Sequence, residues 1–441
     1  MKTVETVISH QLSVISYQLS VISYQLSVIS YQLSVISYQL SVISHQLSVN
    51  SLLPKTHYPL TKTQNPLLIT HYPFPLPYSM TLNFDQQMMQ QCLKLARQAL
   101  GKTAPNPLVG CVIVQDGKII GEGFHPGAGE PHAEVFALRN AGEQAKGATV
   151  YVNLEPCNHF GRTPPCTEAL IAAKIAKVVV GMVDPNPLVS GTGIQRLKDA
   201  GIEVIVGIET ADCQQLNEAF THQILHHQPL GIWKYAMTLD GKIATTTGHS
   251  YWVTGTEARQ KVHQLRVACD AVIVGGNTVR RDNPLLTTHD AGEPNPLRVV
   301  MSRTLDLPKQ AHLWDTQEAK TLVITEEGIN PDFQHFLQNK GVEVAELSPL
   351  TPAQVMTYFY KRQFLSVLWE CGGTLATNAL KDGSIHKILA FIAPKIIGGS
   401  GAPSPVGDLG FTQMTEALLL ERMTWGSVGC DLWIEGYLSP A

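Results

Sequence analysis

No run of 18 or more apolar residues occurs in the 441-residue sequence, so no segment is predicted to form a membrane-spanning helix. The N-terminus also lacks the basic and apolar stretches that together form a secretory signal. A disulfide scaffold is excluded too, because eight cysteines scattered over this length do not make a framework of pairs. These absences favour a cytoplasmic protein in a reducing compartment.

Positive charge is also scarce. The chain has 32 Lys and Arg against 36 Asp and Glu, a net charge of −4. The first 79 residues contribute three Lys and one Glu, which leaves 29 basic and 35 acidic side chains, or −6, in the remainder. An acidic body is a poor electrostatic match for a polyanion, so we expect no nucleic-acid partner. Without a spanning segment we expect no membrane partner either.

The segment 1–79 contains a nearly perfect repeat, Tyr-Gln-Leu-Ser-Val-Ile-Ser, as at Tyr17–Ser23 and Tyr24–Ser30. A coiled coil is one explanation, but the repeat has no charged pairs and is rich in poor helix formers. The seven-base unit TCAGTTA, read three times, translates into the same repeat in rotated phase. We therefore interpret residues 1–79 as translated tandem-repeat DNA, non-native or disordered, with Met80 as the candidate initiator.

One short pattern indicates the chemistry. A His-Ala-Glu triplet at 132–134 opens a helical run, and a Pro-Cys pair ending at Cys157 follows a predicted strand, with another cysteine at Cys166. Zinc held by one imidazole and two thiolates keeps its fourth position open for a water that ionises near neutral pH. Glu134 is poorly placed to join His132 as a ligand and is better suited to moving the proton of that water. The pattern is typical of zinc hydrolytic deaminases.

A structural alternative exists, in which both cysteines are buried thiols and His132 caps a helix. It requires the residue types, their order and the strand-then-Pro-Cys context to coincide by chance. The usual deaminase pattern ends in Pro-Cys-x-x-Cys, whereas eight residues, 158–165, separate the cysteines here. If both ends are ligands, this polar insertion lies beside the metal and can help form the substrate pocket. The remaining cysteines are expected to be ordinary core thiols: Cys92, Cys111, Cys213, Cys269, Cys371 and Cys430.

The apolar patterns predict two α/β domains. In the first, 80–226, expected strands are 109–114, 118–124, 148–154, 177–181 and 203–207, with helices near 133–142, 167–173 and 191–200. Alternating strands and helices about one sheet predict an α/β/α sandwich. In the second, 229–441, expected strands are 232–237, 271–274, 298–301, 321–325, 343–346, 366–370 and 387–391. Asp116-Gly117 between apolar runs predicts a hairpin in the first domain.

Other features suggest ligand binding without proving it. Asn106 lies between two prolines just before a strand, where it can present its amide to a heterocycle edge; a turn asparagine is the alternative. Gly275-Gly276 and Gly372-Gly373 each close a strand, so backbone N–H groups can approach a phosphate there. A plain strand-helix turn explains a glycine pair equally well. Neither pair belongs to a Gly-x-Gly-x-x-Gly motif, so a Rossmann domain is not indicated.

These motifs resemble those of a known family. His-Ala-Glu at 132–134, Glu-Pro-Cys-x-His-x-Gly-Arg-Thr-Pro-Pro-Cys at 155–166 and Asp-Pro-Asn-Pro at 184–187 are similar to the deaminase half of the bifunctional riboflavin-biosynthesis deaminase-reductases. The long cysteine spacing separates that family from cytidine and tRNA adenosine deaminases. The resemblance runs from about Gln86 to near the C-terminus. It implies the zinc ligands His132, Cys157 and Cys166, with Glu134 as the catalytic proton donor.

The second half resembles the reductase of the same family, which is similar to dihydrofolate reductase in fold and uses NADPH. Thr-Leu-Asp-Gly-Lys at 238–242, Trp-Val-Thr at 252–254 and Glu-x-Gly-Gly-Thr-Leu at 370–375 carry this resemblance. It implies cofactor contacts from Ala236, Trp252, Thr278, Asp282, Gly372, Gly373, Thr374, Leu375, Ala376, Thr377 and Asn378. It implies substrate contacts from Ser250, Arg266, Leu286 and Glu370. Asp282 is also a candidate proton source; without the resemblance, Arg266 would be taken for a helix-surface charge.

Two departures from the family pattern concern phosphate binding. An arginine that usually follows the Leu-Thr pair at 286–287 is replaced by His289, so that substrate contact is weaker or titrates near neutral pH. The strand at Val299 usually ends in Asp-Ser but here ends in Ser302-Arg303. We hypothesise that Arg303 contacts the adenosine 2′-phosphate and favours NADPH over NADH.

The resemblance implies two consecutive reactions on a small phosphoribosyl pyrimidine. The first is hydrolytic deamination of 2,5-diamino-6-ribosylamino-4(3H)-pyrimidinone 5′-phosphate, and the second is NADPH reduction of the ribosyl chain to ribityl. The expected cofactors are Zn²⁺ and NADPH, and a homo-oligomer is expected. Alternatives are a nucleic-acid or nucleoside deaminase, a deaminase whose reductase-like domain is non-catalytic, and a second domain that only binds phosphosugars.

Overall fold

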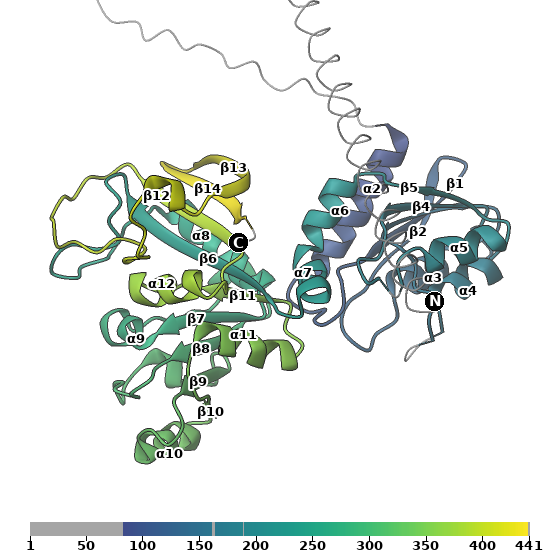
Figure 1. The fold of residues 1–441 in the computed structure, drawn as a ribbon. Helices are drawn as coiled ribbons and strands as arrows, with labels where there is room; N and C mark the ends of the chain where they lie inside the picture. The colour runs from purple at the N-terminus through teal and green to yellow at the C-terminus, as the bar shows by residue number, and fades with distance from the viewer. Residues whose placement is uncertain (1–82, 161–163, 188, 440–441) are drawn as a thin grey trace, which may run out of the picture. The chain divides into compact units, whose positions relative to one another are not determined.

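The computed structural model describes residues 83–160, 164–187 and 189–439 (Figure 1). The interpretation of residues 1–79 and of Met80 lies outside the described residues. Two sheets organise the rest of the chain, one of five strands and one of nine. No helix of the described residues is both long and apolar enough to cross a membrane.

The five-stranded sheet is mixed. Its strands lie in the order β2 (Lys118–Phe124), β1 (Gly110–Gln115), β3 (Thr149–Leu154), β4 (Lys177–Met182) and β5 (Glu203–Val206). β1 runs antiparallel to β2 and β3, whereas β3, β4 and β5 are parallel. The central strands are buried on both faces, which explains the uninterrupted Val178-Val179-Val180 run.

Helices cover both faces of this sheet and complete the predicted α/β/α sandwich. One face packs on α3 (Ala133–Ala141), α4 (Cys166–Ala172) and α5 (Thr192–Asp199). The opposite face packs on α2 (Phe84–Ala96) and α6 (Thr210–Leu216). The sequence patterns did not indicate α6 or the following helix, α7 (Glu218–His226).

Two glycines of β2 set how closely α3 approaches the sheet. A Cβ at Gly121 would lie 2.3 Å from the Ala137 carbonyl oxygen, and one at Gly123 would lie 2.4 Å from that of Ala133. Neither position therefore tolerates a side chain without displacing the helix. This contact fixes the first turn of α3, which carries the His-Ala-Glu triplet.

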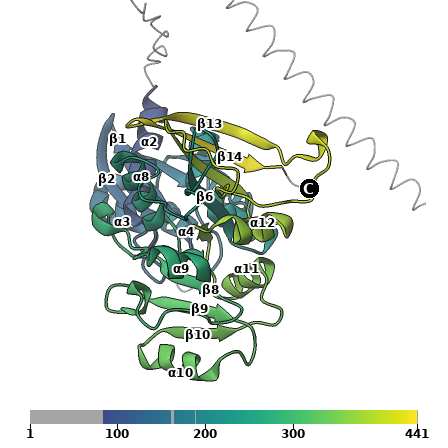
Figure 2. The ribbon, with the colours of Figure 1, turned by 90° about the vertical axis from the view of Figure 1, so that its left-hand side faces the viewer.

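The nine-stranded sheet is parallel over most of its width. Its order is β10 (Glu343–Glu346), β9 (Thr321–Thr325), β8 (Leu297–Met301), β7 (Ala271–Gly275), β11 (Ser366–Trp369), β6 (Leu230–Thr238), β12 (Lys387–Ala393), β14 (Asp431–Leu438) and β13 (Leu420–Val428). Within this sheet, β14 runs antiparallel to both of its neighbours, β12 and β13. Figure 2 shows β10 and α10 at one edge of this sheet and β13 at the other.

Helices α8 to α12 cover the second sheet, and Ala219 of α7 packs against its core as well. α9 (Gly276–Asp282) and α10 (Pro331–Asn339) pack on one face, and α11 (Pro352–Lys361) and α12 (Gly373–Lys381) pack on the other. α8 (Thr256–Ala268) packs on Leu389 and Phe391 of β12. Short 3₁₀ turns are η1 (Arg97–Ala99), η2 (Gly142–Ala145), η3 (His289–Ala291), η4 (His312–Trp314) and η5 (Met414–Glu416). Both domains therefore have the predicted α/β class.

Candidate metal centre and reductase cavity

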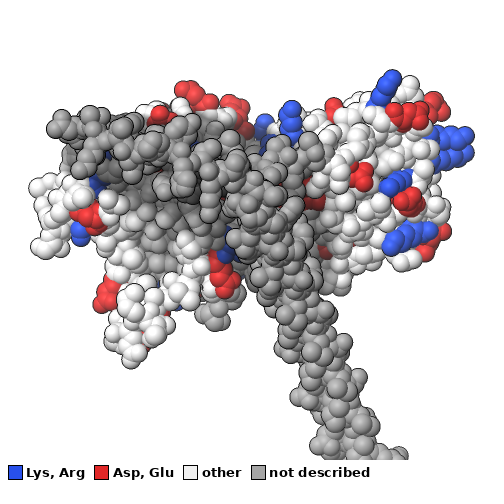
Figure 3. Space-filling model, turned by 90° about the horizontal axis from the view of Figure 1, so that it is seen from above, with Lys and Arg blue, Asp and Glu red and all other residues white. Residues whose placement is uncertain are grey.

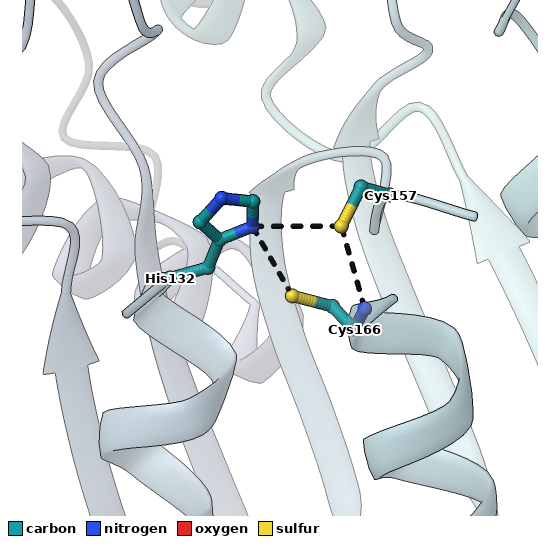
Figure 4. Close-up of side chains that lie close together, drawn as sticks. All are labelled: His132, Cys157 and Cys166. Atoms are coloured by element: carbon teal, nitrogen blue, oxygen red, sulfur yellow. Dashed lines mark hydrogen bonds between the residues drawn. The ribbon is translucent and has the colours of Figure 1, made fainter. Parts of the chain in front are cut away.

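The His-Ala-Glu triplet lies at the start of α3. His132 is the N-cap residue, so its ring is held at the positive end of the helix. Cys157 follows β3, and Cys166 is the first residue of α4 after Pro165. Three separate elements therefore bring one imidazole and two thiols together, as Figure 4 shows.

The distances between the ligand atoms of this cluster fit a metal ion with tetrahedral coordination. His132 Nδ1 lies 3.5 Å from Cys157 Sγ and 3.3 Å from Cys166 Sγ, and the three ligand atoms all lie within 4.8 Å of one another. Zinc bonds of about 2.0–2.3 Å would separate such atoms by roughly 3.5–3.8 Å. It is the one such group of His, Cys, Asp and Glu side chains found within 83–160, 164–187 and 189–439.

The two cysteines differ in their readiness to lose a proton. Hydrogen bonds from Cys166, through its thiol and its backbone N–H, and from His132 lower the pKa of Cys157 to about 4. The neighbouring Cys157 and burial raise the pKa of Cys166. Proton loss is therefore easier from Cys157 than from Cys166, and a divalent cation would stabilise both as thiolates.

Glu134 lies beside the cluster but is not part of it. Its side chain is buried, and its Oε2 has no hydrogen-bond partner among the described residues. Burial, and then the nearby Cys157, raise the pKa of Glu134 to about 7. Burying a carboxyl oxygen without a hydrogen-bond partner is costly unless a bound ligand supplies that hydrogen bond. An unpaired oxygen of this kind is suited to exchanging a proton with a bound water.

His125, which the sequence patterns did not single out, connects Asn106 to this centre. Its Nδ1 lies 3.1 Å from the Pro131 carbonyl oxygen, which can only accept a hydrogen bond, so Nδ1 is the donor. The other nitrogen, Nε2, therefore accepts a hydrogen bond from the Asn106 amide nitrogen at 3.0 Å, which fixes the rotation of that amide. The rings of His125 and His132 are 5.4 Å apart, so Asn106 lies near the predicted metal ligands.

Glu155 is a second residue that the patterns missed. It is buried directly before Pro156, and it accepts hydrogen bonds from the backbone N–H groups of Asp184, Gly191, Gly193 and Ile194 at 2.9–3.2 Å. One carboxylate thus joins the Asp-Pro-Asn-Pro segment and the start of α5 to the loop that carries Cys157. The Glu-Pro-Cys motif was visible in the sequence, but the partners of its glutamate were not.

A cavity of about 830 Å³ opens at the carboxyl ends of the parallel strands in the second sheet. Ligands of open α/β sheets bind at this edge. Most predicted reductase residues line it: Ala236, Ser250, Trp252, Arg266, Thr278, Asp282, Leu286, Arg303, Glu370, Gly372, Gly373, Thr374, Leu375 and Asn378.

Three predicted residues do not line this cavity. Ala376 is fully buried in the core, and Thr377 donates its hydroxyl to the Gly373 carbonyl while accepting from Gly407 N–H. His289 is exposed, and its ring centroid lies 4.3 Å from that of His263. The structure therefore does not place His289 with the residues predicted to bind substrate.

A buried charge cluster forms part of the cavity. Arg266 donates to Glu370 from Nε at 2.6 Å and from Nη2 at 3.1 Å, and Lys234 donates to the same carboxylate at 3.4 Å. Burial alone would raise the pKa of Glu370, but the two cations outweigh it and lower the pKa to about 2. Arg266 is thus a buried ion-pair partner and not a surface charge, and two cations share one anion. Lys234, on β6, was not predicted.

The remaining cysteines are free. Five of the six that were expected to be core thiols are buried, whereas Cys430 is exposed. The prediction was wrong for Cys430 because it lies in the two-residue turn between β13 and β14, a hairpin that the patterns did not indicate.

One imidazole and two thiols placed to hold a metal, beside a buried carboxyl group outside that cluster, define a metal-dependent hydrolytic deaminase. It is joined here to a second domain with a large cavity lined by cationic side chains. Comparisons with known proteins agree. Residues 82–182 match the cytidine and deoxycytidylate deaminase zinc-binding region, and residues 229–434 match the RibD C-terminal domain. The RibD riboflavin biosynthesis protein of Synechocystis is 63% identical over 354 residues, 80% of this chain and 96% of that protein.

Solved structures extend the similarity to the whole described fold. RibD of Acinetobacter baumannii superposes with a TM-score of 0.72 at 40% identity, covering 81% of this chain and 99% of that one. A deaminase-reductase of Thermotoga maritima gives 0.71 at 34% identity, with the same coverage. The chain belongs to the RibD family of bifunctional riboflavin-biosynthesis enzymes, and it uses Zn²⁺ and NADPH. Because both domains match, the deaminase-only alternative is not favoured.

Proposed function

We propose that this chain catalyses two consecutive steps of riboflavin biosynthesis from two domains, 80–226 and 229–441. The first hydrolyses the amine of 2,5-diamino-6-ribosylamino-4(3H)-pyrimidinone 5′-phosphate, and the second reduces the ribosyl chain of the product to ribityl. The observation that carries the first step is the His132, Cys157 and Cys166 cluster beside the unpartnered Glu134 oxygen. The charge cluster in the cavity supports the second.

In the deaminase domain, His132, Cys157 and Cys166 would hold the zinc. When bound, zinc supplies a Lewis acid that lowers the pKa of a water at its open position. Glu134 Oε2 takes a proton from the attacking water and passes it to the departing amine. Burial of Glu134 suits both tasks, because a pKa near neutrality lets one carboxyl accept and release a proton.

Asn106 and His125 are proposed to orient the pyrimidine. The Pro131 carbonyl fixes the His125 tautomer, and His125 in turn fixes the rotation of the Asn106 amide. The amide oxygen would then accept a hydrogen bond from a ring N–H or amino group of the substrate. His125 is a positioning residue in this scheme, because it acts through Asn106.

In the reductase domain, NADPH supplies the hydride when it is bound. Ala236, Trp252, Thr278 and the 372–378 loop are proposed to contact it, although Ala376 and Thr377 would do so only through the backbone. Arg266 and Lys234 leave one net positive charge beside Glu370, which suits an anionic sugar phosphate. Ser250 and Leu286 would complete the substrate contacts.

Asp282 is the proposed proton donor for the reduction. Burial raises the pKa of Asp282 above its ordinary value, which makes this carboxyl a weaker acid that holds a proton more readily than an exposed aspartate. Its Oδ1 accepts from the Ser250 hydroxyl at 3.4 Å, so the carboxyl lies next to a proposed substrate contact.

An assay that separates the two steps tests the proposed function. Ammonia release from the diaminopyrimidine substrate reports the first, and NADPH oxidation with the purified aminouracil intermediate reports the second. We expect wild type to show both. Ammonia release without NADPH oxidation would favour a second domain that only binds phosphosugars.

We also propose that the protein is a cytoplasmic homo-oligomer without a nucleic-acid partner. Charges of both signs are interspersed on the face in Figure 3, with no continuous basic patch on the part that is described. β13 is an edge strand near which large apolar side chains are exposed, including Leu419 at 70% and Trp425 at 73%. Such an edge is usually covered. Light scattering of wild type and of a Leu419→Lys, Trp425→Lys variant tests this, since a monomeric wild type would contradict it.

A further inference from the structure

Arg303 lies at the rim of the reductase cavity, just beyond the end of β8. In the sheet, Met301 of β8 pairs with Gly275 of β7. Arg303, two residues further on, therefore lies beside the glycine pair that closes β7, and both strand ends line the cavity. Ser302 and Thr304 also line it and add two hydroxyl groups.

The Arg303 guanidinium is exposed and has no hydrogen bond or ion pair within the part of the chain that the structure describes. Its neighbour Arg280 is different. Arg280 donates to Asn277 and to the Asp306 carbonyl, and it forms an ion pair with the Asp306 carboxylate at 3.6 Å. Of these two cations, Arg280 is already held by protein partners, and Arg303 is available to an anion.

The distance of Arg303 from the cluster of Lys234, Arg266 and Glu370 determines which part of a ligand it can contact. Lys234 lies on β6, and the order β8, β7, β11, β6 places three strand spacings between the two regions. At about 4.8 Å per spacing, this is roughly 14 Å. A dinucleotide whose reacting end lies near Ala236 of β6, a predicted cofactor contact, would therefore extend its far end, the adenosine, toward β8.

We propose that Arg303 binds the 2′-phosphate of NADPH and so selects this cofactor over NADH. The inference deepens the proposed reductase function and rests on it. A planar guanidinium forms paired, charge-assisted hydrogen bonds with a phosphate, and the hydroxyls of Ser302 and Thr304 can donate to its remaining oxygens. NADH lacks this phosphate, so the charge on Arg303 would contribute nothing to its binding.

Binding of fragments that cannot react tests this without any turnover. We would titrate 2′,5′-ADP and 5′-AMP into the full-length protein by calorimetry, using wild type, Arg303→Ala, Arg303→Lys and Arg280→Ala. Arg303→Ala is expected to weaken 2′,5′-ADP roughly ten- to hundredfold, with 5′-AMP unchanged. Arg303→Lys should recover part of the loss, and Arg280→Ala, the matched control, should change the affinity less than about threefold. Unchanged 5′-AMP binding also shows that the variants are folded.

Two results would overturn the proposal. If Arg303→Ala keeps the preference of wild type for 2′,5′-ADP, another group binds the 2′-phosphate and Arg303 is misassigned, although the reductase function stands. If wild type binds neither nucleotide, the proposed cofactor site itself is wrong. The ratio of kcat/KM for NADPH and NADH gives a second readout and should fall in Arg303→Ala through loss of NADPH efficiency alone.

Discussion

The two sites of this chain are built in opposite ways. The deaminase centre is a small, partly buried cluster in which three ligand atoms lie within 4.8 Å of one another, and two short sequence motifs supply all of them. The reductase site is an open cavity of about 830 Å³ whose lining comes from segments between Lys234 and Pro403. A compact site depends on a few exact side chains, whereas a distributed site depends on a fold that keeps many segments in register. The two should therefore respond differently to substitution.

The largest effect is expected from Glu134→Gln. The amide keeps the size of the side chain but cannot shuttle a proton, so ammonia release should fall by about 10²–10⁴-fold. Zinc content by metal analysis should not change, and NADPH oxidation with the aminouracil intermediate serves as the internal control. Loss of zinc in this variant would mean that Glu134 is a ligand and that its role is misassigned.

Arg298→Met tests the distributed site, because it should lower the stability of the reductase domain. Arg298 is fully buried and donates to the carbonyl oxygens of Leu285, Leu313, Asp315 and Ala319 at 2.6–3.3 Å. Removing it leaves several buried acceptors unpaired, which should destabilise the reductase domain by about 3 kcal/mol or more. Chemical denaturation measures this, and Arg298→Lys should lose less. A variant as stable as wild type would contradict the idea that this arginine holds the loops together.

The pH dependence of stability should identify the Glu370 cluster. The folded-state pKa of Glu370 is about 2, below its ordinary value of 4.5, so its ion pairs stabilise the fold above pH 4.5 and are lost as the pH falls toward 2. The shift corresponds to about 3 kcal/mol at neutral pH. Glu370→Gln should therefore be clearly less stable than wild type at pH 6, and the gap should shrink at pH 3. A gap that does not depend on pH would show that the ion pairs are not its source.

Glu155→Gln should have the smallest effect. The amide keeps one acceptor oxygen for the four backbone N–H groups that now share a carboxylate, so we expect a loss of about 1–2 kcal/mol. Hydrogen exchange should increase in the segment 184–194 and not in the reductase sheet. Exchange that rises equally in both domains would mean that Glu155 supports the whole chain and not this loop alone.

The compact site could be predicted from the sequence and the distributed one only in part. His132, Cys157 and Cys166 occur in motifs whose residue types, order and context seldom coincide by chance, and the structure brings them together. Lys234 and Arg298 gave no such signal, because a lysine in a strand and an arginine in a strand are informative only once their partners are known. Arg266 was informative only through the family resemblance.

The strands also differ in how well the sequence predicts them. Buried strands such as β4 and β7 were predicted nearly to the residue, because they are apolar on both faces. The β13–β14 hairpin was missed, since β13 alternates poorly and most of its side chains are exposed. The turn residue Gly429, with φ +60°, was the signal that could have revealed it, because a glycine in a two-residue loop favours a hairpin.

Removal and return of the metal tests most directly the claim that one chain holds two independent sites. One preparation of wild type should be assayed for ammonia release and for NADPH oxidation before chelation, after chelation and after addition of Zn²⁺. We predict that ammonia release disappears and returns with about one zinc per chain, while NADPH oxidation with the aminouracil intermediate stays constant. Loss of both activities on chelation, or of neither, would contradict it.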